Sequence, residues 1–158
     1  RLEAIRNSAP AERTETSIAT LRGRAPITDR ITALLETATD RIAMAAPTET
    51  ALADPIKKTM RERAESGVIV QVMTAQPAVA TVFDADPIEV YVMDEDNPAD
   101  FAGRGVLVDD STVLLAVEPT DTGDSEQALW TADTTFGHIL ARFMQSGMQS
   151  GIDGHNAD

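Results

Sequence analysis

The stretch FAGRGVLVDDSTVLLA, residues 101–116, decides how the chain around it is interpreted. It holds two apolar runs, GVLV and STVLLA, with a pair of aspartates between them. Short runs of β-branched and aliphatic residues are typical of strands, and aspartate favours turns because its side chain bonds the nearby backbone. The stretch therefore predicts a β-hairpin of two buried strands joined by a tight Asp-Ser turn.

The residues before the hairpin alternate between short apolar segments and longer amphipathic ones. Three segments predict strands: TSIATLRG (16–23), RIAMAA (41–46) and VIVQVMT (68–74). Between them, APITDRITALLETATD (25–40) and the stretch from Thr48 to about Ser66 have apolar residues at helical spacing. This order predicts right-handed crossovers and a largely parallel central sheet flanked by helices.

The residues beyond these segments complete one α/β domain. PAVATVFDAD (77–86) predicts a short helix, and PIEVYVMDE (87–95) and EQALWTAD (126–133) predict strands. A closing helix from Thr134 to about Met144 has one apolar face, made of Phe136, Ile139, Leu140 and Phe143. We expect the aromatic residues Trp130 and Phe136 to pack in the core, with a ligand cleft or a dimer contact as the alternative. We place the domain at 16–146, after the end of a helix and a linker (1–15) and before a flexible, glycine-rich tail (147–158).

Composition excludes several classes of function. The chain has 158 residues, 26 acidic against 13 basic, and its net charge of −13 opposes direct binding to a nucleic-acid backbone. Without cysteine it has no thiol nucleophile, and no apolar run is long enough for a membrane span. We expect a cytoplasmic protein that touches no membrane. The acidic, lysine-poor composition resembles that of proteins from extreme halophiles.

The order of elements resembles one half of a phospholipase-D-like enzyme, whose catalytic motif is H-x-K-x-x-x-x-D at the start of a strand. If Asp109 is the aspartate, Arg104 occupies the lysine position and Ala102 the position of the nucleophilic histidine. Alanine cannot form a phosphohistidine, and His138, in the closing helix, has no partner at metal-ligand spacing. We therefore expect no enzymatic activity, no metal and no cofactor.

An ordered series of motifs resembles the C-terminal, phospholipase-D-like effector domain of the TrmB family of archaeal transcriptional regulators. The series covers residues 18–144 and consists of I-x-x-L-x-G (Ile18 to Gly23), RIAMAAPTE, RAESGVIVQVMT, GRGVLVDDSTVLL and WTADTTFGHILARFM. The resemblance implies a homodimeric domain that senses a small metabolite, either a sugar or a phosphorylated or otherwise anionic compound. It also implies that DNA is bound only by a separate winged helix-turn-helix before Arg1.

Ligands of open parallel sheets bind outside the carboxyl ends of the strands. That edge is predicted to hold the segment from Arg22 to Arg24 after the first strand, Pro47 and Thr48 after the second, and the segment from Thr74 to Gln76 after the third. Arg104 is the preferred ligand contact because it occupies the lysine position of the motif, and arginine suits an anion. Asp109 completes the candidate ligand-binding set. Each of three has a structural alternative: Thr48 as a helix N-cap, Arg104 as a surface partner of Asp109 or Asp110, and Asp109 as the anchor of the hairpin turn.

Two functions remain open from the sequence. The first is an effector-sensing and dimerisation domain of a TrmB-like regulator. The alternative is a stand-alone protein-interaction module on a catalytically inactive phosphodiesterase-like scaffold. A ligand-sized cleft beside Arg104 separates the two.

Overall fold

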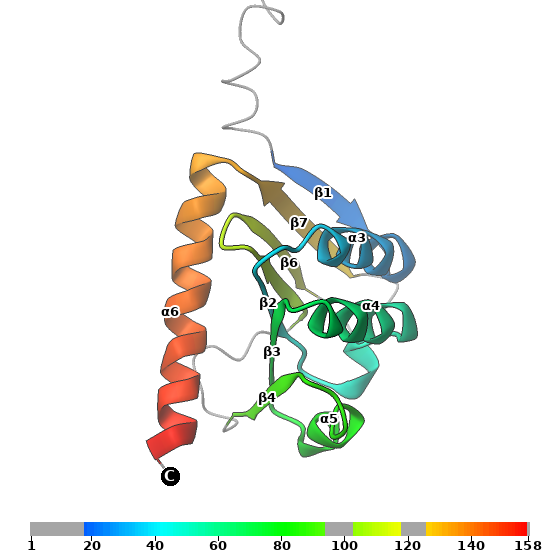
Figure 1. The fold of residues 1–158 in the computed structure, drawn as a ribbon. Helices are drawn as coiled ribbons and strands as arrows, with labels where there is room; N and C mark the ends of the chain where they lie inside the picture. Colours follow the sequence, from blue (N-terminus) through cyan, green and yellow to red (C-terminus); the bar gives the residue numbers. More distant parts are fainter. Residues whose placement is uncertain (1–17, 94–102, 118–125, 158) are drawn as a thin grey trace, which may run out of the picture.

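The computed structural model describes residues 18–93, 103–117 and 126–157, with the backbone alone described after residue 146. Strands alternate with helices in the first half of the described chain, a run of strands follows, and a long helix ends it (Figure 1). Their bounds are β1 (Ala19–Arg22), α3 (Arg24–Glu36), β2 (Arg41–Ala45), the 3-10 helix η1 (Glu49–Ala51), α4 (Asp54–Glu65), β3 (Ile69–Thr74), α5 (Pro77–Val82), β4 (Glu89–Val92), β5 (Gly105–Val108), β6 (Thr112–Val117), β7 (Gln127–Ala132) and α6 (Thr135–Ala157).

The strands form one seven-stranded sheet in the order β1-β7-β6-β5-β2-β3-β4. The predicted α/β class with flanking helices is confirmed, but the sheet is mixed: among the strands that the structure describes, only β2, β3 and β4 pair in parallel. β1 was expected in a parallel sheet with β2 and β3, but it pairs antiparallel with β7 at the far edge. Its residues alternate between half-buried and exposed. Such a strand suits an edge, whereas a central parallel strand is buried on both faces.

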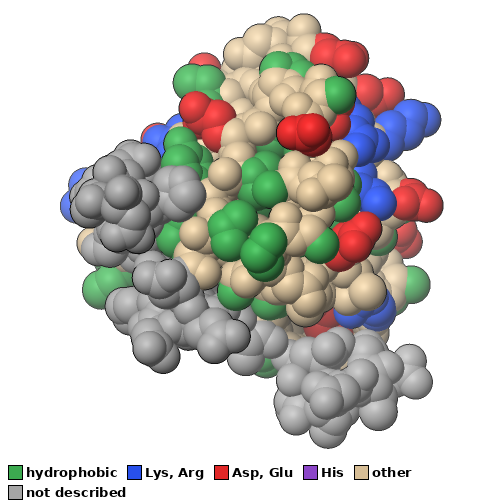
Figure 2. Space-filling model, turned by 90° about the horizontal axis from the view of Figure 1, so that it is seen from below, with side chains coloured by type: hydrophobic (Ala, Val, Ile, Leu, Met, Phe, Trp, Pro, Cys, Tyr) green, Lys and Arg blue, Asp and Glu red, His purple; other side chains and the backbone are tan. Residues whose placement is uncertain are grey.

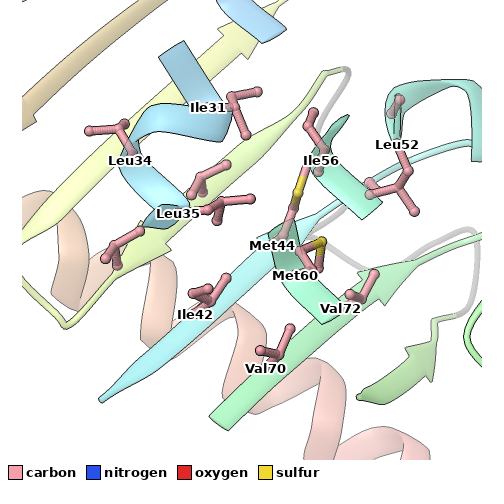
Figure 3. Close-up of a cluster of buried hydrophobic side chains, with 14 of the residues drawn as sticks. Ile31, Leu34, Leu35, Ile42, Met44, Leu52, Ile56, Met60, Val70 and Val72 are labelled. Carbon is pink, nitrogen blue, oxygen red and sulfur yellow. The ribbon is translucent and has the colours of Figure 1, made fainter. Parts of the chain in front are cut away.

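Helices α3, α4 and α5 cover one face of the sheet, and α6 lies across the other (Figure 1). The larger core fills the first layer. Figure 3 shows its centre, where Ile31, Leu34 and Leu35 of α3 and Ile56 and Met60 of α4 lie in one cluster with alternate residues of β2 and β3: Ile42, Met44, Val70 and Val72. Alternation places Ala43, Ala45 and Met73 on the opposite face, against α6.

The predicted hairpin is confirmed, with β5 and β6 paired antiparallel. Its turn lies one residue earlier than the Asp-Ser pair, because Asp109 and Asp110 have φ angles of 52° and 61° and the Ser111 N–H donates to the Val108 carbonyl. Two successive left-handed residues are the geometry of a type I′ turn, which matches the twist of paired strands.

Helix α6 differs from its prediction in length and in orientation. It continues to Ala157, through most of the segment expected to be a flexible tail. Glycines lower helix propensity by about 1 kcal/mol each without forbidding a helix, and no proline interrupts this one. The residues against the sheet are Gly137, Ala141 and Met144, whereas Phe136, Ile139 and Phe143 of the predicted apolar face are 45%, 46% and 73% exposed.

A physical reason for this orientation is the closeness of the helix to the sheet. A Cβ added at Gly137 would lie 2.9 Å from the Thr134 hydroxyl oxygen and 3.0 Å from the Thr131 methyl group. Small residues on the inner face therefore allow a close approach that phenylalanine would prevent. The outcome is an exposed apolar stripe on α6, made of Phe136, Ile139 and Phe143.

Candidate functional site

The carboxyl ends of β2 and β3 meet the start of β5 at one edge of the sheet. β5 pairs antiparallel with β2, with Gly105 opposite Ala45, so Arg104 lies at the edge where β2 ends. Thr48 follows β2, and Thr74 and Gln76 stand at the end of β3. The structure thus brings these predicted residues to one edge, and their contact with a ligand stays a prediction.

Arg104 is buried at this edge and forms an ion pair with Glu126. Its exposed fraction is 2%, and that of Glu126 is also 2%. The Arg104 Nε and Nη2 atoms donate to the two carboxylate oxygens at 2.9 and 2.7 Å. Its Nη1 atom donates to the Thr28 hydroxyl at 2.9 Å and to the Ala51 carbonyl at 3.3 Å. The expected surface pairing of Arg104 with Asp109 or Asp110 is therefore wrong.

Two partners of Arg104, Glu126 and Thr28, were not predicted from the sequence. An arginine next to a fully buried strand requires a carboxylate, because charged side chains are almost never buried unpaired. Glu126 immediately precedes the apolar run of β7, and this position was the available signal. Gly23 fixes its backbone, since the Gly23 N–H donates to the Glu126 carbonyl at 2.8 Å.

Three of the candidate residues converge on the backbone of η1. The Glu49 N–H donates to the Gln76 side-chain oxygen at 3.0 Å, and Arg24 donates to the Thr50 carbonyl. Arg104 reaches the third residue, Ala51, as described above. The candidate residues therefore shape a turn, and the turn links the ends of β2 and β3 to α3.

Two threonines of the predicted set have local roles. Thr48 is not the N-cap of the long helix: α4 begins at Asp54, after Ala53, and the Thr48 hydroxyl pairs with that of Thr50 at 2.8 Å. Pro55 explains the later start, because proline is well suited to the first turn of a helix. Thr74 is buried, and its hydroxyl accepts the Gln76 N–H at 3.1 Å.

Asp109 lies at the opposite end of β5 and is not brought together with the others. Its carboxylate accepts the backbone N–H groups of Thr39, Asp40 and Arg41 at 2.9, 2.8 and 3.0 Å. Partial burial alone would raise the pKa of Asp109, but these N–H groups and the Thr39 hydroxyl lower it below its usual value. Asp109 thus anchors the loop before β2 rather than bonding the backbone of its own turn.

An open groove of about 620 Å³ lies on the sheet itself, lined by β1, β6 and β7. We call it the sheet groove. Leu21 and Ala128 pack toward α3, so their neighbours along each strand face the other side of the sheet. The lining residues are Thr20, Leu21, Arg22, Leu115, Val117, Gln127, Ala128 and Leu129.

The remaining surface offers little further chemistry. Among the described residues, no group of three histidine or acidic side chains is placed to hold a metal ion. No described helix is long and apolar enough to cross a membrane. Figure 2 shows hydrophobic side chains in the middle of one face, with basic and acidic side chains intermixed along one side. Ala102 lies outside the described residues.

Comparison with solved structures decides the fold. TrmBL2, described as an archaeal chromatin protein with a novel mode of DNA binding, superposes with a TM-score of 0.58 at 20% identity. NucT from Helicobacter pylori superposes with a TM-score of 0.62 at 16% identity, over 85% of this chain and 95% of NucT. Phosphatidylserine synthase from Haemophilus influenzae superposes with a TM-score of 0.61 at 16% identity, over 85% of this chain and 38% of the synthase.

The fold is phospholipase-D-like. No family model and no curated protein matches the sequence. The match with TrmBL2 covers 94% of this chain but 58% of TrmBL2, so the chain spans a little more than half of that protein.

Proposed function

We propose that this chain is a non-catalytic, effector-sensing and dimerisation domain of a TrmB-like transcriptional regulator. DNA is bound by a separate winged helix-turn-helix domain. The observation that carries the non-catalytic part of the proposal is the buried ion pair between Arg104 and Glu126, because Arg104 stands at the lysine position of the motif that the sequence resembles. The likeness to TrmBL2 supports a role in chromatin or transcription.

The ion pair argues against phosphoryl chemistry at this edge. The Glu126 carboxylate neutralises Arg104, and both side chains are buried. To bind Arg104, an anion must displace Glu126. The displaced Glu126 carboxylate is then buried without a partner, at a cost of several kcal/mol. Together with alanine at the histidine position, this arrangement supports a scaffold that retains the fold of a phosphodiesterase without its nucleophile.

The exposed stripe on α6 supports dimerisation. Phe136, Ile139 and Phe143 are at helical spacing and are all more than 40% exposed. Adjacent large apolar side chains on a surface mark an interaction site, and a patch that meets its own copy about a two-fold axis gives a dimer. The stand-alone interaction module uses the same stripe for a different protein, so a monomeric chain favours that alternative.

Net charge supports the assignment of DNA binding to another domain. A charge of −13 repels a phosphate backbone, and on the face drawn in Figure 2 basic side chains lie among acidic ones. The chain alone is therefore expected to show no affinity for duplex DNA at physiological salt.

Hydrolysis of bis(p-nitrophenyl) phosphate tests the proposal at the edge that carries it. The wild-type chain is expected to release nitrophenol no faster than buffer. Turnover that disappears in the variant Arg104→Ala but persists in Lys58→Ala, a change of the same charge on an exposed residue of α4, contradicts the proposal. Turnover equal in all three proteins does not come from the edge at Arg104.

A further inference from the structure

The register of the sheet orders the side chains of the sheet groove into two rows. Arg22 pairs with Gln127, which pairs with Val117. Thr20 pairs with Leu129, which pairs with Leu115, and these make the second row. Rows two residues apart on three neighbouring strands span about 7 Å along the strands and about 10 Å across them.

The two sides of the groove differ in chemistry. The apolar side chains Leu115, Val117 and Leu129 lie on β6 and β7, and Val117 is 52% exposed although it is a valine in a strand. The polar side chains Thr20 and Arg22 lie on β1, and Gln127 stands between the two sides. A mainly apolar cavity with a few polar groups at one side is the usual composition of a small-molecule site.

Arg22 is the cation of this groove. Its side chain is exposed, and the ion pairs recorded among the described residues belong to Lys57, Arg61 and Arg104. A chain with a net charge of −13 repels anions in general. The exposed guanidinium of Arg22 at the rim of the groove attracts an anion locally despite this repulsion. Arg104 lacks this property because Glu126 neutralises it.

The dimensions of the groove favour a small molecule over a protein. The apolar floor covers on the order of 70 Å² by strand spacing, whereas a stable protein interface needs about 800 Å² from each partner. Its volume of about 620 Å³ lies within the range of small-molecule sites. A bicyclic ring system or a medium-length acyl chain matches the floor.

We propose that the sheet groove binds a small amphipathic anion. The apolar body of the ligand lies on Leu115, Val117 and Leu129, and its carboxylate accepts hydrogen bonds from Arg22. The groove thereby replaces the edge at Arg104 as the effector site. Its role as an effector site rests on the proposed function, but its binding of an amphipathic anion is measured on the chain alone.

The test uses anilinonaphthalene sulfonate fluorescence and calorimetric titration with sodium octanoate. One dye is expected to bind per chain and to be displaced by octanoate, but not by acetate, which lacks the apolar body. Arg22→Gln is expected to lower the affinity for octanoate at least about tenfold, because one charge-assisted hydrogen bond is lost. Val117→Asp has a similar effect, because it places a carboxylate on the floor.

The matched control is Lys58→Gln, which makes the same charge change on an exposed residue of α4 and leaves octanoate affinity within about twofold. Circular dichroism melts show whether each variant is folded. Failure of octanoate to bind the folded wild type overturns the proposal. Dye binding that Arg22→Gln leaves unchanged also overturns it and assigns the dye to the stripe on α6.

The solution mass of the same samples separates the two proposals. A dimer that does not bind octanoate contradicts the groove and leaves the proposed function standing. A monomer that binds octanoate through Arg22 supports the groove and contradicts the dimeric regulator.

Discussion

The guanidinium of Arg104 donates to both carboxylate oxygens of Glu126 at 2.7 and 2.9 Å, and both side chains are sealed from solvent. The pair joins the start of β5 to the start of β7, which lie 22 residues apart in the chain, and ties both to α3 through Thr28. This polar cluster therefore holds the sheet edge together.

Breaking this pair is expected to destabilise the protein strongly. Glu126→Leu leaves the buried guanidinium without its carboxylate and should lower the free energy of unfolding by about 3–5 kcal/mol. The double variant Arg104→Met, Glu126→Leu should recover most of that loss, because apolar residues of similar volume replace a buried ion pair well. Urea unfolding of the wild type, both single variants and the double variant measures the coupling. If the double variant loses as much free energy of unfolding as the two single variants together, the ion pair is not the source of the stabilisation.

Asp109 is expected to make stability depend on acidity. Because its folded pKa is depressed, its contribution is complete above the ordinary aspartate value of 3.8 and is lost as pH falls through the lowered value. Asp109→Ala should lower the free energy of unfolding by about 2 kcal/mol at pH 7, since three backbone N–H groups lose a charged acceptor. Asp109→Asn should cost less, because asparagine accepts the left-handed φ of the turn.

Urea midpoints measured from pH 6 down to pH 3 test this origin. The difference in midpoint between wild type and Asp109→Asn should shrink as the pH falls. A difference that stays constant over the acid range shows that the carboxylate charge is not responsible.

Asp110 offers a stabilising substitution. It is exposed and has a φ of 61°, which costs a residue with a Cβ atom about 1 kcal/mol but costs glycine nothing. Asp110→Gly should therefore raise the free energy of unfolding by about 0.5 kcal/mol, after loss of the exposed contact with Gln145. Ser111→Gly, at a neighbour without a left-handed φ, is the control and should give no gain. If Asp110→Gly and Ser111→Gly change the free energy of unfolding equally, the left-handed φ of Asp110 is not the cause.

Gly103 and Gly105 form a matched pair for packing. A Cβ at Gly103 would lie 1.9 Å from the Ala116 carbonyl oxygen, whereas a Cβ at Gly105 meets side-chain atoms at 3.5 Å and beyond. Gly103→Ala should lower the melting temperature sharply, with a loss of about 3 kcal/mol or more, and Gly105→Ala should change stability by less than about 1 kcal/mol. Equal melting temperatures of the two variants contradict the close approach of Gly103, just before β5, to β6.

Local patterns in the sequence predicted the hairpin, the α/β class and the edge where candidate residues gather. These features depend on alternation and helical spacing over a few residues, as in VIVQVMT and in the two runs around Asp109. The partner of Arg104 could not be read from spacing, because it comes from another strand. The place of β1 was missed for the same reason, since its pairing with β7 joins two ends of the domain.

The orientation of α6 shows a further limit of periodicity. Phe136, Ile139 and Phe143 form the more apolar stripe, and hydrophobic spacing assigns them to the core. The structure buries Gly137 and Ala141 instead, because their small side chains let the helix approach the sheet closely. The sheet groove was also not predicted, since it depends on which part of the sheet α6 leaves open.

Sedimentation equilibrium of the chain tests the proposed regulator domain most directly. The wild type is expected to have twice the mass of one chain at micromolar concentration, and Phe143→Ser should dissociate it to monomers. Ile69→Ser, which removes an apolar side chain 56% exposed in β3 and outside the α6 stripe, should remain dimeric. A wild type that stays monomeric at every concentration contradicts the account and favours an interaction module for another protein.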